Sequence, residues 1–168
     1  MKCIKKLVAL TLAAVLALTM LTACGGTPSV PEKTEATQQV VDNINAVRTE
    51  NGLSALESNA AATDVANKIL ELKEKKALNL ISEEDYQKES SKLYSIQVDG
   101  KKFNGSMSVT STGSCEETMT KEYCQKKYDE NDMERVMGRI MRSSDLTYIA
   151  VASRKMSNGK FISVVIVY

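Results

Sequence analysis

The chain ends in Phe161-Ile162-Ser163-Val164-Val165-Ile166-Val167-Tyr168, a run that is apolar at every position except Ser163. In an extended strand successive side chains point to opposite faces, so this strand is apolar on both faces and needs cover on both. A second β-rich run, Leu146–Arg154, precedes it, and Asn158-Gly159 between them is typical of a hairpin turn. The run therefore predicts an α+β fold of the α-β-α sandwich kind, with a small antiparallel sheet covered by helices on both faces.

Amphipathic patterns predict the helices that such a sheet needs. They run from Val40 to Gly52, from about 58 to 76, from Ser82 to about 93, from Ser114 onward and from Met133 to Met141. The last has apolar residues at i, i+3, i+4, i+7 and i+8, the strongest such pattern in the chain. A further strand is predicted where Met107 and Val109 alternate with polar residues.

The composition excludes several classes of function. The chain has 168 residues, a length typical of one domain, and no histidine. It therefore lacks the imidazole of Ser-His-Asp and Cys-His catalytic systems and of histidine zinc sites. Its net charge of +1 gives no electrostatic basis for nucleic-acid binding. We expect a non-enzymatic domain without cofactor or metal; an enzyme with a lysine or carboxylate base stays open, although no residue marks one.

The N-terminus has the charge and hydropathy pattern of a targeting segment. Lysines among the first six residues precede the apolar run Leu7–Met20, which is too short to span a bilayer comfortably. Leu21-Thr22-Ala23-Cys24 is similar to a lipobox, in which the cysteine receives diacylglycerol before cleavage. The resemblance implies that residues 1–23 are removed, that Cys24 is lipidated and that the protein lies on the outer face of the bacterial cell membrane. The alternatives are an uncleaved anchor helix or secretion after cleavage near Ala23.

Both prolines of the chain follow Cys24, so residues 24–39 are predicted to be the lipidated cysteine and a flexible tether, with the folded domain at 40–168. Two acyl chains hold a protein on a membrane stably, whereas one does so only marginally. Removing the leader takes away lysines and no acid, so the mature domain is mildly acidic.

Cys115 and Cys124 are the cysteines left once the leader and the lipidated residue are set aside. In an oxidising compartment they could form a disulfide. On one continuous helix their Cα atoms would lie roughly 13 Å apart, whereas a disulfide needs about 7 Å or less. They are therefore either bonded, with Cys115 folding back ahead of the helix, or free buried thiols.

The helix and turn after residue 43 read Ile44-Asn45-x-x-Arg48-x-x-x-Gly52-Leu53-x-x-Leu56. This pattern resembles the first helix and turn of the CAP superfamily, which groups cysteine-rich secretory proteins, venom antigen 5 and plant pathogenesis-related proteins, and it is the most specific of several such resemblances. Ala61–Ile69 is similar to its alanine-rich second helix, Asp99-Gly100 with Phe103 to its Asp-Gly loop, and Met137–Ala152 to a helix end, loop and strand. The resemblance covers residues 40–168 with a gap.

The resemblance also implies where a metal site has been lost. CAP domains often hold two histidines and two acids around a central cleft, and the histidine positions correspond to Ser95 and to Val136 or Met137. The family's Gly-Glu-Asn segment corresponds to Gly113-Ser114-Cys115, followed by Glu116. We therefore expect a degenerate CAP-like domain whose cleft binds no metal and is formed around Ser95, Cys115, Glu116 and Met137.

Two further features suggest contacts with other molecules. Residues 70–94 are similar to the short helical hairpin called SHOCT, without its turn glycine, and are either an extended second helix plus hairpin or a partner-binding insertion. Arg135, Arg139 and Arg142 recur at helical spacing and could meet anionic lipid headgroups or cell-wall polymers, or be a solvated face. The acids at 129–134 lack the alternation and the glycine of a calcium loop, so we expect a helix N-terminus there.

The sequence thus predicts a lipid-anchored, extracytoplasmic binding module without catalytic residues. Its ligand would be an envelope component, a peptide or a small apolar molecule. Methionine side chains adapt to varied ligands, so a shallow hydrophobic cleft near Met137 is a second candidate site for the ligand. The alternative is that the methionines only fill the core. The alternative function is a structural protein whose 70–94 hairpin recruits another envelope protein, with the cleft vestigial.

Overall fold

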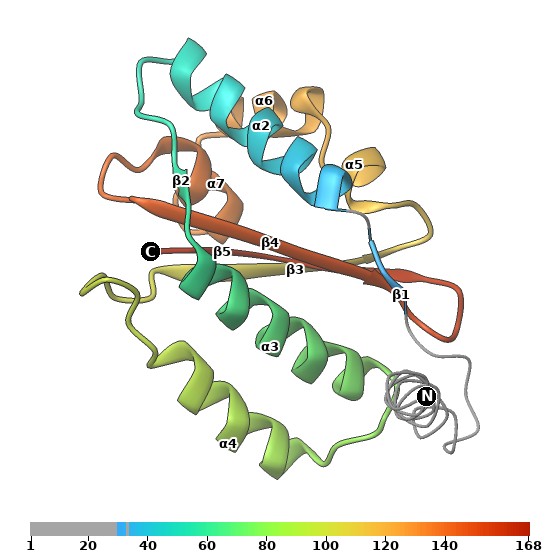
Figure 1. Cartoon of the computed structure of the whole chain (residues 1–168). Coiled ribbons are helices and arrows are strands. Elements are labelled where there is room, and N and C mark those ends of the chain that lie inside the picture. Colours follow the sequence, from blue (N-terminus) through green and yellow to red (C-terminus); the bar gives the residue numbers. More distant parts are fainter. Residues whose placement is uncertain (1–29, 33) are drawn as a thin grey trace, which may run out of the picture.

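The computed structural model describes residues 30–32 and 34–168. They form an α+β domain in which a small sheet lies between two layers of helices (Figure 1). In chain order the elements are β1 (Val30–Pro31), α2 (Thr34–Glu50), β2 (Glu57–Ser58), α3 (Ala60–Ala77), α4 (Glu83–Tyr94), β3 (Gly105–Ser111), α5 (Cys115–Thr118), α6 (Lys121–Asp129), α7 (Val136–Arg142), β4 (Tyr148–Lys155) and β5 (Phe161–Val167). No helix in this part of the chain is long and apolar enough to cross a membrane. The predicted leader at 1–23 and the lipidation site Cys24 lie outside the described residues.

The apolar strand β5 lies inside the sheet and divides the core in two. The strand order is β1-β4-β5-β3, and each of these neighbours is antiparallel. Val165 and Val167 pack into the core with α2 and α7, whereas Val164 and Ile166 pack into a second core with α3. The α-β-α sandwich is therefore confirmed (Figure 1). The sheet is mixed rather than purely antiparallel, because β2 runs parallel to β4.

The turn between β4 and β5 forms where the sequence predicts it. Gly159 has a φ of +82°, a conformation that residues with a Cβ rarely adopt. The N–H of Met156 donates to the carbonyl of Lys160 at 2.8 Å and closes the hairpin. The register that follows sets Ser153 opposite Ser163, and their hydroxyl oxygens lie 2.7 Å apart inside the sandwich. Two buried polar groups thus satisfy one another.

The segment that most resembles CAP domains holds the loop after α2. The Asn45 side chain donates to the carbonyl of Leu56 at 2.9 Å and accepts the N–H of the same residue at 2.8 Å. The Arg48 side chain is fully buried and donates to the carbonyls of Ser54, at 3.0 Å, and Ile140, at 2.5 Å. Because Ile140 lies in the last turn of α7, this cation complements the helix dipole while it joins two helices.

The folded domain begins earlier than residue 40. Val30–Pro31 pairs with β4 as an edge strand, where the missing N–H of proline costs no sheet hydrogen bond. Helix α2 then begins at Thr34, and the Glu32 carboxylate accepts the backbone N–H of Cys115 at 3.1 Å. The described part of the predicted tether at 24–39 is therefore part of the fold.

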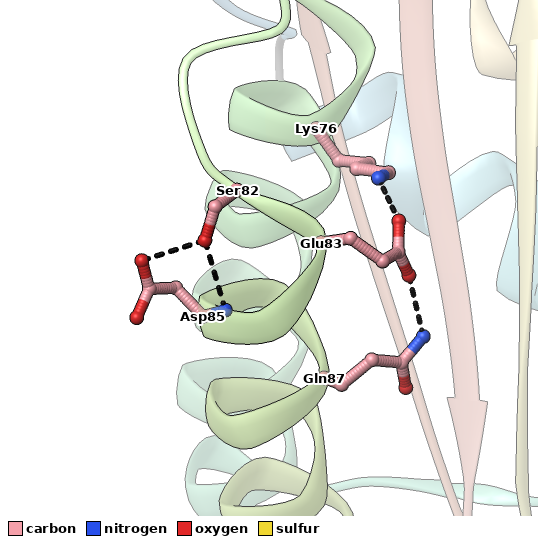
Figure 2. A network of polar contacts seen from close by, with 5 residues as sticks. All are labelled: Lys76, Ser82, Glu83, Asp85 and Gln87. Carbon is pink, nitrogen blue, oxygen red and sulfur yellow. Dashed lines mark hydrogen bonds and ion pairs between the residues drawn. The ribbon is translucent and has the colours of Figure 1, made fainter.

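Helices α3 and α4 form the hairpin expected at 70–94. Asn79 adopts a φ of +56° in the turn, the conformation for which glycine is otherwise used. At the start of α4 the Ser82 hydroxyl accepts the N–H of Asp85 and donates to its carboxylate at 2.7 Å, and Glu83 pairs with Lys76 of α3 (Figure 2). Within α4 only Ser90 is buried, so α4 lies mainly on α3 as an outer helix (Figure 1).

The helix predicted from Ser114 is divided in two. Ser114 and Glu117 form a capping box, in which each side chain accepts the backbone N–H of the other, at 3.3 and 2.8 Å. Helix α5 nevertheless ends at Thr118, because Thr120 caps the new helix α6 by accepting the N–H of Tyr123 at 3.2 Å. The amphipathic pattern from Met133 is shortened in the same way, since α7 begins at Val136 and Met133 is 43% exposed.

Candidate functional site

The residues of the predicted cleft are not brought together. Ser95 is exposed at the C-terminal end of α4, where its hydroxyl donates to the carbonyl of Lys92 at 2.7 Å. Cys115 and Met137 are buried in the core on the other face of the sheet, and Glu116 is exposed next to Cys115. The expectation of one cleft was therefore wrong, because the sheet lies between Ser95 and the other three residues.

Cys115 and Cys124 are free thiols in the core beneath α2 and do not form a disulfide. Burial raises the pKa of each thiol to about 12, and for Cys115 the neighbouring Glu32 carboxylate acts in the same direction. A thiol in this environment is protonated at neutral pH. Neither cysteine therefore supplies a thiolate nucleophile.

The three arginines of the predicted cationic face have different surroundings. Arg135 is 78% exposed at its side chain and pairs with Asp132 at 3.0 Å. Arg139 is half-buried beside Gly105 of β3. Arg142 lies over the Tyr128 ring, 4.1 Å from its centroid, and its Nε donates to the Tyr128 carbonyl at 2.7 Å. The guanidinium groups of Arg139 and Arg142 are thus packed against other residues. The three arginines do not form one exposed basic surface.

The acidic segment between α6 and α7 is a turn rather than a helix N-terminus. The Asp132 carboxylate accepts the N–H groups of Glu134, at 3.2 Å, and Arg135, at 3.3 Å. Asp129 ends α6 instead of beginning a helix. Within residues 30–32 and 34–168 no group of acids and thiols is arranged to hold a metal ion.

A pocket of about 410 Å³ lies beside Met137, bounded by the edge strand β3, by α6, by α7 and by the turn between these helices. Its apolar lining consists of Met107, Tyr123, Val136, Met137 and Gly138. Its polar lining consists of Ser106, Lys127, Glu130, Asp132, Glu134 and Arg135. A wider hollow of about 760 Å³ over α6 is lined by polar and charged residues alone. The pocket beside Met137 is thus the better candidate for a ligand site, since such sites combine an apolar floor with a few polar groups.

Gly138 lets the turn approach α7 closely. A Cβ at this position would lie 1.8 Å from the carbonyl oxygen of Asp132, a distance that no side chain tolerates. The same turn contains Met133. In the described part of the chain, Met133 and Leu80 are the large hydrophobic residues that are exposed. The pocket therefore has an exposed apolar residue in the turn that bounds it.

Ion pairs fix most of the charges at the rim of the pocket. The Lys127 ammonium lies 2.6 Å from a Glu130 oxygen and 5.6 Å from the centroid of the Tyr123 ring. Its hydrogen bond to Glu130 raises the pKa of Lys127, so the ammonium stays charged. Arg135 pairs with Asp132, whereas Glu134 has no ion-pair partner among the residues described. The rim thus has an unmatched negative charge.

Sequence reasoning identified Met137 and Arg135 but missed the other lining residues. Met107 was expected in a half-exposed strand, yet nothing in its spacing indicated that it would lie near Tyr123 and Lys127. A signal was present at Gly138, since an isolated glycine inside an amphipathic helix pattern often marks a close approach of another segment.

A scan against protein-family models and a search of curated proteins found no match for this chain. The resemblances to CAP domains and to the SHOCT hairpin therefore rest on the residues that carry them.

Proposed function

We propose that the chain is a lipid-anchored, extracytoplasmic binding module with a degenerate CAP-like fold, and that its ligand occupies the pocket between β3 and α7. The pocket is the observation that carries this proposal. Its floor of Met107, Tyr123 and Met137 is continuous with the core, and its rim is charged. Methionine side chains adapt to ligands of varied shape, which suits such a floor to apolar groups.

The anchor is supported by the leader and by the arrangement of the sheet. The lipobox-like Leu21-Thr22-Ala23-Cys24 would attach the chain just ahead of β1. β1 and β3 are the opposite edge strands of the order β1-β4-β5-β3, so about 14 Å of sheet separates the anchored edge from the pocket. A ligand could therefore enter from the side away from the anchor.

The anchor is tested with Cys24→Ser in the full-length chain. We expect this variant to leave the membrane fraction and to lose incorporation of labelled palmitate, whereas Cys3→Ser, within the removed leader, keeps both. If the wild-type chain stays on the membrane but incorporates no labelled palmitate, the lipid anchor is contradicted.

The pocket is tested through the methyl signals of the methionines in the full-length chain, labelled with ¹³C and purified in detergent. Pools of short peptides, short-chain phospholipids, cell-wall fragments and small apolar molecules are added in turn. We expect one pool to shift the signals of Met107 and Met137 and to leave those of the core residues Met119 and Met141 unchanged. Met107→Glu should abolish the response, and Leu80→Glu should not. If no pool moves the pocket signals, the proposal fails.

The α3–α4 hairpin is the second candidate for a contact with another envelope protein. Leu80 at its tip is 70% exposed, and α4 has an almost fully solvated outer face. If the hairpin is the binding element, Leu80→Glu abolishes association with the partner and Met107→Glu does not. The reverse result favours the pocket.

A further inference from the structure

The outward backbone groups of β3 follow from the hydrogen bonds of its neighbours. Tyr148 and Tyr168 exchange two backbone hydrogen bonds, of 3.2 and 3.1 Å. Because hydrogen-bonded pairs alternate along an antiparallel ladder, the backbone groups of the even-numbered residues of β5 form hydrogen bonds with β4. The backbone N–H and C=O groups of the odd-numbered residues of β5 point toward β3, where Val165 is opposite Met107. The N–H and C=O groups of Ser106, Ser108 and Thr110 therefore point away from the sheet.

These outward groups lie on an unprotected edge. In the described chain β3 pairs with β5 alone, and no loop or side chain forms a hydrogen bond with the outward N–H and C=O groups. The strand reads Gly-Ser-Met-Ser-Val-Thr-Ser, without the lysine or proline that natural proteins use to block edge pairing. A second strand can therefore be added here.

The pocket opens onto this edge. Ser106 and Met107 both line it, although adjacent residues of a strand direct their side chains to opposite faces. A hollow lined by both residues therefore extends to the free edge of β3, where the backbone groups of Ser106 point outward. In an added strand the residue opposite Met107 shares its face, with Cβ atoms about 5 Å apart, so its side chain would enter the pocket near Tyr123.

We propose that the ligand is an extended peptide that joins the sheet as a strand beside β3, with an apolar side chain in the pocket and a basic side chain near Glu134. This inference rests on the proposed function, because it names the ligand class of the same pocket. A peptide backbone matches the outward N–H and C=O groups of β3, which a small apolar molecule leaves unpaired. A second copy of the chain fits less well, since its β3 has no basic residue to meet Glu134.

The probe is acetyl-Thr-Lys-Thr-Leu-Thr-Val-Thr-amide, which has the seven-residue length of β3 and carries its lysine and leucine two positions apart, so that both side chains share one face. It is compared with two isomers that carry N-methyl groups on alternate amides, one on the second, fourth and sixth residues and the other on the third, fifth and seventh. One edge of an added strand bonds to β3 and the other faces water. We therefore expect one isomer to bind about tenfold or more weakly and the other to bind like the parent.

Ser108→Pro and Ser108→Ala form the matched pair of variants in the full-length chain. Proline removes an N–H that points outward and breaks no bond between β3 and β5, whereas alanine keeps that N–H. We expect Ser108→Pro to weaken binding of the peptide about tenfold or more and Ser108→Ala to leave it unchanged. Circular dichroism checks that both variants are folded; if the proline variant is not, the methylated peptides still decide.

Three results would overturn the inference. If both methylated isomers bind equally, or Ser108→Pro binds like the wild type, the pocket takes side chains without strand pairing. If small apolar molecules move the Met107 and Met137 signals and the peptide does not, the pocket functions as proposed but with another ligand class. If the chain is a dimer that Ser108→Pro dissociates, the edge belongs to a second copy. If neither the peptide nor any pool of ligands moves the signals of Met107 and Met137, the proposed function itself is contradicted.

Discussion

Gly138→Ala tests the close packing that shapes the pocket. The new Cβ would lie 1.8 Å from the Asp132 carbonyl oxygen. A carbon–oxygen contact needs about 3.3 Å, so the turn must move outward by about 1.5 Å. Overpacking of this kind costs about 1–3 kcal/mol, and the better helix propensity of alanine offsets up to about 1 kcal/mol. Because a 1.8 Å contact belongs at the upper end of that range, we expect a net loss of about 1–2 kcal/mol, which lowers the Tm of a domain of this size by roughly 3–7 °C.

The assay combines thermal unfolding with the methionine methyl spectrum. Gly138→Ala should lower Tm and move the signals of Met133 and Met137, because the turn and α7 separate. Ser91→Ala, on the exposed face of α4, is the control, since it improves helix propensity without a clash and should neither lower Tm nor move the pocket signals. A Gly138→Ala variant that is as stable as the wild type, with unmoved pocket signals, would refute the close contact between the turn and α7.

Other predictions concern the buried groups of the fold. Arg48→Met removes the donors to the carbonyls of Ser54 and Ile140, so the free energy of unfolding in urea should fall by about 2–4 kcal/mol; a change below about 0.5 kcal/mol would contradict this role. Cys115 and Cys124 have pKa values of about 12, so at pH 8 a disulfide reagent should label them no faster than the protein unfolds, and rapid labelling of the native chain would contradict their burial. Because the folded pKa lies above the ordinary value of 9.0, both thiols stay protonated in the folded state while the unfolded chain ionises, so stability should fall as the pH rises from 9.0 toward 12. A Cys115→Ala, Cys124→Ala double variant should lose less stability over that range, and an equal loss would assign the effect to other groups.

Local patterns predicted the three long strands β3, β4 and β5 and most of the helices, but not the two-residue strands β1 and β2. The apolar run of β5 required cover on both faces, and Asn158-Gly159 specified the hairpin, because both signals lie within a few residues. The split between α5 and α6 was missed because Thr120 competes as a helix cap with a continuing helical pattern, and only packing decides between them. Pro31 suggested a tether, but a proline also suits an edge strand once a partner strand is present.

The candidate site depends on contacts between distant segments, which explains why the predicted cleft failed. Whether Ser95 lies near Cys115 depends on the side of the sheet on which α4 lies, and no residue near Ser95 indicates that side. The pocket beside Met137 depends on the approach of Asp132 to Gly138 and on the register of β3 against β5. The sequence indicated adaptable methionines near this place but could not identify Met107 and Tyr123 as the rest of the floor.

The most direct test of the account is amide hydrogen exchange along β3, measured by NMR on the full-length chain in detergent. We predict alternation, with rapid exchange at Ser106, Ser108 and Thr110, whose N–H groups point outward, and slow exchange at Met107 and Val109, which bond to β5. Addition of the peptide should protect the rapidly exchanging amides. Uniform protection in the free monomer, or rapid exchange at Ser108 that the bound peptide does not slow, would contradict an open strand edge as the binding element.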